Sequence, residues 1–220
     1  MENVPGLAAK RKINGANTEN ICYLKTAVAK LLSMGYNVRT TKTCASHFGD
    51  PQERERLVLL ASKQGYVLPL APLRTHGDPG DGLQPIVTAR DVLHDLEGVE
   101  PNFSGRIKIN GKTVSDHSVE GTKIANISDN DVRLKAWAPA QTVRKKNKIV
   151  HYKHSLGRYL TLLERKRLMS FPDEHVLCGK PSEIRDQIGN AVPCRFAESI
   201  GKAIMESYSL GKFTLPSNDD

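Results

Sequence analysis

The stretches YNVRTTKT (Tyr36–Thr43) and LVLLA (Leu57–Ala61) lie on either side of a polar loop, Ser46–Glu55. The first is rich in Val, Thr and Tyr, which favour β-strands, and the second is short and wholly apolar, as in a strand buried on both faces. Before them, Asn17–Met34 places its apolar residues on one stripe, offers a polar cap at its start and is followed by Gly35. The order helix, strand, loop, strand predicts part of an α/β domain.

The composition is that of an ordinary globular protein. The 220 residues are 39% hydrophobic and 25% charged, which excludes collagen-like, coiled-coil and wholly disordered chains. No apolar run approaches the ~20 residues of a membrane-spanning helix, and the first residues show no signal-peptide pattern. Four cysteines without a C-x-x-C pair and seven histidines without a metal-binding spacing argue against a disulfide framework and a metal site. We therefore predict an intracellular protein.

The middle of the chain has a different texture. From about Gly65 it is rich in proline and glycine, and its hydrophobic periodicity is weak. One helix, Thr88–Leu96, and one strand near Arg106–Ile109 are predicted there. We interpret this part as a loop-rich insert and expect three segments, residues 1–65, 66–155 and 156–220.

Regular structure returns after the insert. Thr161 and Glu164 match a capping box, so a short helix is expected to follow and to stop at Phe171–Asp173. Gln187–Pro193 is predicted to be a turn into a last helix. The apolar stripe of that helix consists of Phe196, Ile200, Ala203 and Ile204.

The net charge of +8 arises in one segment. Between residues 133 and 167 lysine and arginine are frequent and Glu164 is the only acid. Such a block suits a polyanion, because neutralising phosphates releases counterions, although a solvated face or a flexible basic loop explains it equally well. Trp137, Tyr152 and Tyr159 interleave with the cations, and they either stack on bases or pack in a core.

Four short motifs occur along the chain in a fixed order. They are Glu2–Val4, Gly49–Arg56, Leu160–Asp173 and Gln187–Pro193. Together they resemble the C-terminal half of the DNA cytosine-5 methyltransferases, whose series runs E-N-V, G-x-P-Q-x-R-x-R, a variable recognition region, R-x-L-T-x-R-E-x-x-R-L-x-x-F-P-D and Q-I-G-N-A-V-P. The chain departs from the series at Leu163, where the family has Arg, which predicts a weaker polar network at this point.

The resemblance implies a fold. It is a partial S-adenosylmethionine-dependent, Rossmann-like α/β domain that lacks its N-terminal strands, with a small irregular target recognition domain added. Residues 1–65 would belong to the catalytic domain and 66–155 to the recognition region. Residues 156–220 would form the base of the recognition domain and the C-terminal helix that returns to the catalytic domain. A doubly wound sheet without its first strands would expose an apolar edge.

The resemblance also implies a reaction. The target base is extruded from the duplex, a cysteine thiolate adds to cytosine C6, and a methyl group passes from S-adenosylmethionine to C5. Addition of the thiolate places electron density on N3 and O2, so both atoms need preorganised partners. By resemblance, a protonated Glu2 holds N3 and the exocyclic amine, Arg56 stabilises O2, and Arg54 helps to position the thiolate and the base. Taken without the other motifs, the run from Gln52 to Arg56 would be an exposed loop of mixed charge.

Further residues receive roles from the same resemblance. Asn190 and Val192 match the turn that lines the methionine end of the cofactor pocket, while Glu164 and Arg167 would be support residues. The expected partner is double-stranded DNA, and the basic block would contact its phosphates. The expected DNA-binding residues are Gln52, Arg144, Lys145, Lys146 and Lys148.

Two motifs of the family have no counterpart in this sequence. The P-C loop of the nucleophile and the F-x-G-x-G loop of the cofactor site are missing, since Cys194 lies beyond the fourth motif and neither Cys22 nor Cys44 has the flanking loop. We therefore expect the chain alone to be inactive and to need an N-terminal half, from the same gene or from a second subunit, that carries the catalytic cysteine. The alternatives are a non-catalytic DNA-binding relative and a basic nucleic-acid-binding module of unrelated ancestry.

Overall fold

The fold is known from a computed structural model, which describes residues 1–3, 5–8, 22–101, 106–109, 111–115, 117–118, 131–145, 148–153 and 157–211. The chain forms two compact units. The first comprises Met1–Cys44, Glu55–Leu73 and Glu198–Asp220, and the second comprises Ala45–Arg54 and Arg74–Ala197. The loop 45–54, which lies inside the expected segment 1–65, belongs to the second unit, and residues 66–73 belong to the first. Within the described residues no helix has the length and hydrophobicity to span a bilayer.

The first unit is built on a three-stranded antiparallel sheet of order β1-β4-β2. Strands β2 (Tyr36–Cys44) and β4 (Glu55–Lys63) pair along their whole length, and β1 (Glu2–Asn3) pairs with the other edge of β4. The central place of β4 explains its wholly apolar run, since Leu57–Leu60 are all buried. Both predicted strands are therefore confirmed. The described strands of this sheet pair antiparallel, whereas the core of a doubly wound sheet is parallel.

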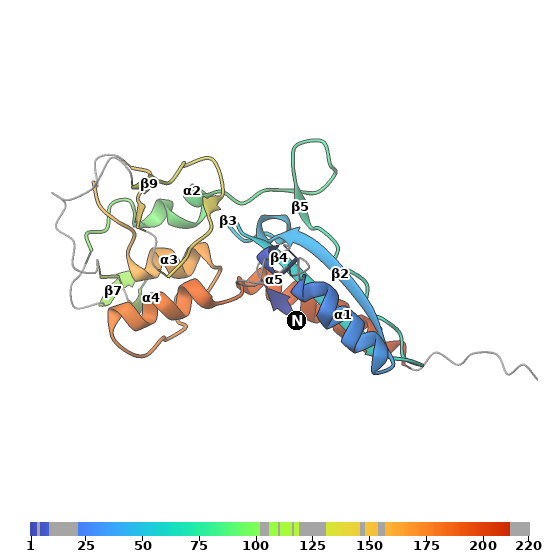
Figure 1. The fold of residues 1–220 in the computed structure, drawn as a ribbon. Coiled ribbons are helices and arrows are strands. Elements are labelled where there is room, and N and C mark those ends of the chain that lie inside the picture. Colours follow the sequence, from blue (N-terminus) through green and yellow to red (C-terminus); the bar gives the residue numbers. More distant parts are fainter. Residues whose placement is uncertain are drawn as a thin grey trace, which may run out of the picture. The chain divides into compact units, whose positions relative to one another are not determined.

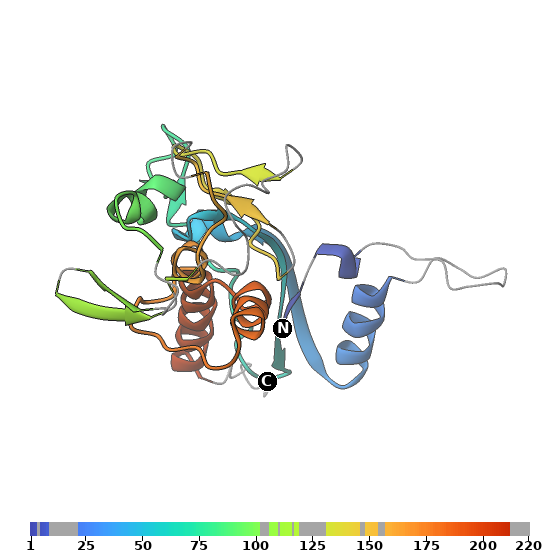
Figure 2. The same cartoon turned by 90° about the vertical axis from the view of Figure 1, so that its left-hand side faces the viewer.

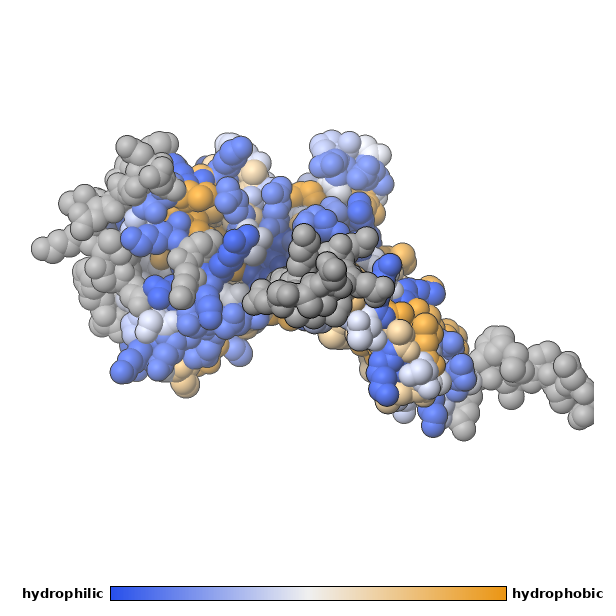
Figure 3. Space-filling model, in the orientation of Figure 1, coloured by the Kyte–Doolittle hydropathy of each residue, from blue (hydrophilic) through white to orange (hydrophobic). Residues whose placement is uncertain are grey.

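Helix α1 (Tyr23–Ser33) precedes the sheet strand β2 and runs beside it (Figures 1 and 2). It begins later than the sequence predicts, because Cys22 is already in extended conformation; the expected first turn, from Asn17, falls outside the described residues. None of the residues of α1 is buried, and the side chain of Leu32 is 53% exposed. Hydrophobic residues accordingly reach the surface in this region of the molecule (Figure 3).

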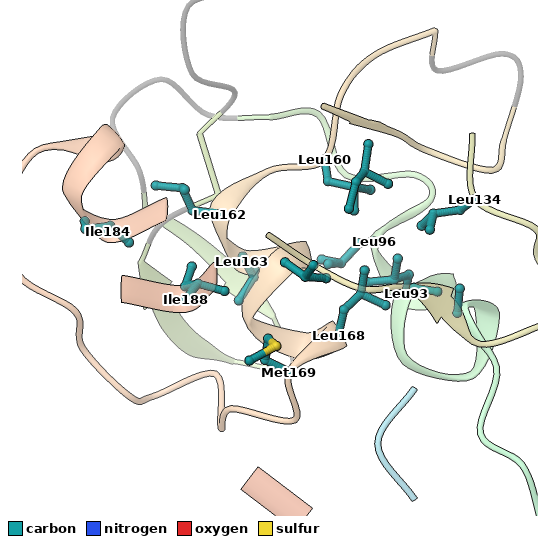
Figure 4. Close-up of a cluster of buried hydrophobic side chains, with 14 of the residues drawn as sticks. Leu93, Leu96, Leu134, Leu160, Leu162, Leu163, Leu168, Met169, Ile184 and Ile188 are labelled. Atoms are coloured by element: carbon teal, nitrogen blue, oxygen red, sulfur yellow. The ribbon is translucent and has the colours of Figure 1, made fainter. Parts of the chain in front are cut away.

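The second unit has a hydrophobic core of its own. Leucines of α2 (Ala89–Leu93) and of the 3₁₀ helix η3 (His94–Leu96) meet side chains of α3 (Leu162–Leu168) and α4 (Pro181–Asn190) (Figure 4). Leu163, Leu168 and Ile188 are fully buried there. Full burial of such a side chain stabilises a fold by about 1.5–3 kcal/mol. The departure from the family series at Leu163 is thus a core position of this unit.

Helix starts follow the capping signals in the sequence. Thr88 and Thr161 each accept a hydrogen bond from the backbone three residues on, and the acid at that position bonds back, so both are complete capping boxes. The expected turn at Gln187–Pro193 is wrong in its first half, because Gln187–Asn190 form the last turn of α4. The sequence signal for α4 was the proline at its first position, Pro181.

The remaining elements are short, except for the last helix. Helix α5 (Cys194–Ser209) buries Phe196 and Ala203 as expected, but Ile204 is 44% exposed. Strand β7 confirms the predicted strand in the insert. The short elements are η1 (Pro5–Ala8), η2 (Ala45–Phe48), β3 (Gln52–Glu53), β5 (His76–Gly77), β6 (Gln84–Pro85), β7 (Arg106–Ile109), β8 (Lys112–Ser115), β9 (Val132–Arg133), β10 (Ala140–Gln141) and β11 (Ile149–Val150).

Candidate functional site

Glu2 and Arg56 come together on neighbouring strands of the first unit. Antiparallel pairing places Glu2 opposite Val58, so the glutamate lies beside the start of β4, where Arg56 projects. The Nε of Arg56 is 2.7 Å from Oε1 of Glu2, and the two side chains are only 10% and 23% exposed. The contact is an ion pair without the alignment of a hydrogen bond. The structure therefore brings together the two residues to which the resemblance assigns N3 and O2 of the base.

Arg54 belongs to the second unit and is 3% exposed. Its Nη1 donates to the carbonyl of Val143 at 2.6 Å, and its Nη2 donates to the carbonyls of Gly189 and Ala191 at 3.0 Å each. One guanidinium thus joins the segment around Val143 to the C-terminal end of α4. The role of Arg54 in positioning a thiolate and a base stays a prediction beside this observed structural role.

Gln52 is fully buried in the same unit. Its Nε2 donates to the carbonyl of Leu168 at 2.8 Å, and its Oε1 accepts from the backbone N–H of Val143 at 3.1 Å. Strand β3, which carries Gln52, also pairs with β10 in parallel, with Ala140 opposite Gln52. The amide is therefore engaged at both ends inside the unit, and its expected contact with DNA stays a prediction.

The last turn of α4 makes a close approach to the basic segment. A Cβ on Gly189 would lie 2.3 Å from the backbone nitrogen of Lys145 and 2.7 Å from its Cα. Only glycine fits this approach, because real Cβ atoms do not come within 3 Å of backbone atoms. The neighbours that resemblance assigns to the cofactor differ in exposure: Asn190 is exposed and Val192 is half-buried.

The expected phosphate contacts are cationic and accessible where the structure describes them. Arg144, Lys145 and Lys148 are exposed, and Lys146 lies outside the described residues. The ammonium of Lys148 sits 5.4 Å from the centroid of the Tyr159 ring, within cation–π range. Exposed lysine and arginine side chains are long enough to reach phosphates without a change in the backbone, so their exposure suits the expected role.

Asp50 is a residue that sequence reasoning left without a role. Its carboxylate is buried and accepts the backbone N–H groups of Arg195 at 3.3 Å and Phe196 at 2.8 Å, which are orphan donors of the first turn of α5. Burial raises the pKa of Asp50 to about 6, against the lowering effect of its hydrogen bonds with Ser170 and with these two N–H groups. The signal was the conformationally restricted G-D-P sequence just before the glutamine.

Glu164 lies at the centre of a buried polar network in the second unit. Arg158 donates to both carboxylate oxygens, from Nη2 to Oε1 at 2.7 Å and from Nη1 to Oε2 at 2.8 Å. The backbone N–H of Thr161 also donates to Oε2, at 2.8 Å. Burial alone would raise the pKa of Glu164, but the hydrogen bonds and charge of Arg158 outweigh it and the pKa is lowered. The expectation of a weak network at Leu163 is wrong, because Arg158 supplies the guanidinium.

Arg167 links three segments of the second unit. It forms ion pairs with Asp95 at 2.5 Å and Asp173 at 2.7 Å, and it donates to the carbonyl of Val92 at 3.0 Å. The two carboxylates hold the pKa of Arg167 above its usual range despite the desolvating effect of burial. Within the described residues no three His, Cys, Asp or Glu side chains gather as a metal site would require.

The profile of C-5 cytosine-specific DNA methylases matches residues 1–206. The chain belongs to this family. Members of the C-5 cytosine methylase family use S-adenosyl-L-methionine as the methyl donor.

Individual relatives extend the comparison. The chain is 27% identical to the type II methyltransferase M.NgoFVII of Neisseria gonorrhoeae, covering 94% of the chain and 58% of the relative. It is 28% identical to M.AplI of Arthrospira platensis, covering 91% and 56%. The chain thus spans little more than half the length of these relatives.

Solved structures show the same fold at lower identity. A protein encoded within an E. coli prophage and described as a DNA modification methyltransferase superposes with a TM-score of 0.70 at 20% identity, over 94% of this chain and 68% of that one. Dnmt2 methyltransferase of S. pombe gives 0.56 at 16% identity, over 94% and 66%. The architecture is therefore that of DNA methyltransferases with mixed α/β content.

Proposed function

We propose that this chain supplies the base-holding and DNA-recognition part of a DNA cytosine-5 methyltransferase. The reaction would transfer a methyl group from S-adenosylmethionine to C5 of a cytosine extruded from double-stranded DNA, inside the cell. The observation that carries the proposal is the contact of Glu2 with Arg56 at 2.7 Å. Membership of the family and the order of the four motifs support it.

The chemistry asks for an acid and a cation side by side. When a thiolate adds to C6, electron density accumulates on N3 and O2 of the ring, two atoms that are close together on one edge. In the proposal the entering base replaces the ion pair: Glu2 takes up a proton and holds N3 and the exocyclic amine, while Arg56 turns to O2. Each side chain is mostly shielded from water, so their hydrogen bonds with the base would face little competition.

The cofactor would contribute an electrophilic methyl group. On the described residues the donor set fits one end of that molecule: the exposed amide of Asn190 can hydrogen bond a carboxylate or an ammonium, and Val192 offers apolar surface. Arg54 fixes the turn between them through the carbonyls of Gly189 and Ala191. We propose that Asn190 and Val192 hold the methionine end.

The nucleophile of the proposed reaction would come from elsewhere. Cys194 opens α5, and burial together with the nearby Asp50 raises the pKa of its thiol, which disfavours the reactive thiolate. Cys22 precedes α1 and directs its Sγ to the carbonyl of Ala8 at 3.3 Å. These positions, and the lengths of the relatives, support a second half that carries the P-C and F-x-G-x-G loops. The unburied apolar side of α1 offers surface that such a half could cover.

Complementation tests the proposal. The chain would be mixed with a separately expressed N-terminal half of a C-5 methylase relative, and labelled methyl transfer to unmethylated genomic DNA would be measured. Transfer in the mixture, none from either half, and none to DNA whose cytosines already carry C5-methyl groups is the expected result. Absence of transfer even when the two halves are covalently fused would favour the other candidate, a non-catalytic DNA-binding relative.

A further inference from the structure

Three aromatic side chains lie among the cations of the basic segment, and they differ in how far they are exposed to solvent. Tyr159 is 6% exposed, and the hydroxyl of Tyr152 donates to Glu97 at 2.6 Å. Trp137, in contrast, is 72% exposed. An exposed indole among cations offers a flat apolar face on which a nucleic-acid base can stack.

The turn that carries Trp137 is firmly anchored. The backbone N–H groups of Ala89 and Arg90, at the start of α2, donate to the carbonyls of Ala138 and Ala136 at 2.9 and 3.0 Å. On either side of the turn, β9 pairs with β11 and β10 pairs with β3. The indole is therefore presented by a fixed backbone rather than by a slack loop, which lowers the entropy lost when a partner binds.

A neighbouring arginine also contacts the indole of Trp137. The guanidinium of Arg90 lies 4.5 Å from the centroid of Trp137, a cation–π contact, and Arg90 is steadied in turn by Glu97 at 3.7 Å. Most of the ring stays accessible beside this contact. Lys135, two residues before the tryptophan, is exposed. An open aromatic ring with cations around it is the combination that binds nucleic acids, because the ring stacks on bases and the cations meet phosphates.

We propose that Trp137 and Arg90 form a base-stacking contact with DNA at a step where stacking is broken. Bases of an intact duplex are covered by their neighbours, so an indole gains most where a base has left the stack. The proposed reaction creates such a step whenever it extrudes a cytosine. This inference rests on the proposed function for its choice of DNA as the partner, and it adds the residue that contacts the opened step.

Trp137 is the single tryptophan of the chain, so its fluorescence reports on this turn alone. The probes are a short duplex with one abasic site, the same duplex fully paired, and heparin, a polyanion without bases. We expect stronger quenching by the abasic duplex than by the paired one, and little by heparin at equal occupancy. Equal quenching by heparin and by the abasic duplex would overturn the inference, as would failure of the chain to bind either duplex.

Variants separate stacking from charge. Affinities of the variants are measured through a fluorescent label on the duplex, because variants at position 137 lack the tryptophan. Trp137→Ala should weaken binding of the abasic duplex about tenfold, a loss of about 1.4 kcal/mol, while Trp137→Phe should keep part of the affinity. Lys135→Ala should weaken binding of both duplexes to the same extent. The slope of the logarithm of the binding constant against the logarithm of the salt concentration should fall in magnitude by about one. Tyr208→Ala, which removes an 80% exposed aromatic from α5, is the matched control and should change neither.

The outcomes also separate this inference from the proposed function. Unchanged affinity of Trp137→Ala, with far-ultraviolet circular dichroism like that of the parent, overturns the inference even when the complemented enzyme methylates DNA. If Trp137→Ala lowers the affinity for the abasic duplex tenfold but no complemented or fused form transfers methyl groups, the stacking contact is supported and the proposed enzymatic role is refuted. Binding of a protein by Trp137 without any effect on DNA would overturn the inference as well.

Discussion

The guanidinium Nε of Arg56 lies 2.7 Å from Oε1 of Glu2, across the pairing of β4 with β1. The register that sets Glu2 opposite Val58 decides this contact, because side chains of a strand alternate between its two faces. A shift of one residue would move Glu2 to the other face and break the pair. Two motifs that are far apart in the sequence are thus joined by the geometry of one sheet.

The first prediction concerns this pair. In the complemented enzyme, Arg56→Ala should lower the rate of methyl transfer by about 10²-fold or more, the typical cost of removing a donor to developing negative charge. Affinity for the duplex should change little, because the guanidinium is mostly shielded and faces Glu2 rather than a phosphate. Rates and duplex affinities measured on the same preparation check this.

The matched control lies on the same strand. Glu55 pairs with Lys42 at 2.9 Å, and both side chains are more than half exposed, so Glu55→Gln should leave rate and affinity near those of the parent. If Arg56→Ala instead weakens binding uniformly and lowers the salt slope by about one, the residue is a plain phosphate contact. That result would favour a basic nucleic-acid-binding module.

The second prediction concerns the close approach at Gly189. Gly189→Ala should destabilise the protein by about 1–3 kcal/mol, because the added Cβ would overlap the backbone of Arg144 and Lys145, which would have to shift. Gly201→Ala is the control in α5: nothing lies within 4 Å of its Cβ, and alanine favours helices, so stability should rise by up to about 1 kcal/mol. Urea unfolding of the two variants gives the comparison, and equal effects would refute it.

The third prediction concerns pH. Since burial raises the pKa of Asp50 from 3.8 to about 6, the folded state holds the proton more tightly than the unfolded state does. The stabilising contribution of this group is therefore full below pH ~4 and is lost as the pH rises through about 6. Relative to Asp50→Asn, the parent should gain up to about 3 kcal/mol of stability on going from pH 7 to pH 4.

Urea unfolding at several pH values, with the parent and Asp50→Asn side by side, isolates this group from the other carboxylates. Asparagine keeps an oxygen that accepts the backbone N–H of Phe196, so the helix start should survive in the variant. A stability difference that does not vary between pH 4 and pH 7 would show that Asp50 titrates normally in the folded protein.

How far the sequence leads can be judged on particular elements. The strands around Leu57–Leu60 and the capping box at Thr161 were predictable, because burial pattern and local capping are written in short stretches. Helix α4 was missed, since its GN motif resembles a turn and its apolar residues are few. The burial of Arg54 and Gln52 was not foreseen either, because it depends on long-range bonds to Val143 and Gly189, which no local pattern reveals.

The last prediction concerns the buried pair of Arg158 with Glu164, which the family motif hinted at but did not explain. Glu164→Gln leaves the guanidinium of Arg158, 4% exposed, without its counter-charge, and should cost about 3–5 kcal/mol. Replacing both together, with Arg158→Met and Glu164→Leu, should recover most of that loss, because the desolvation penalty of both charges disappears at the same time. A double-mutant cycle built from Arg158→Met, Glu164→Leu and the two together, followed by urea unfolding, measures the coupling. Additive losses in the cycle would mean that each side chain acts through other partners, such as Thr161 for the glutamate, and that the pair itself contributes little to holding the second unit together.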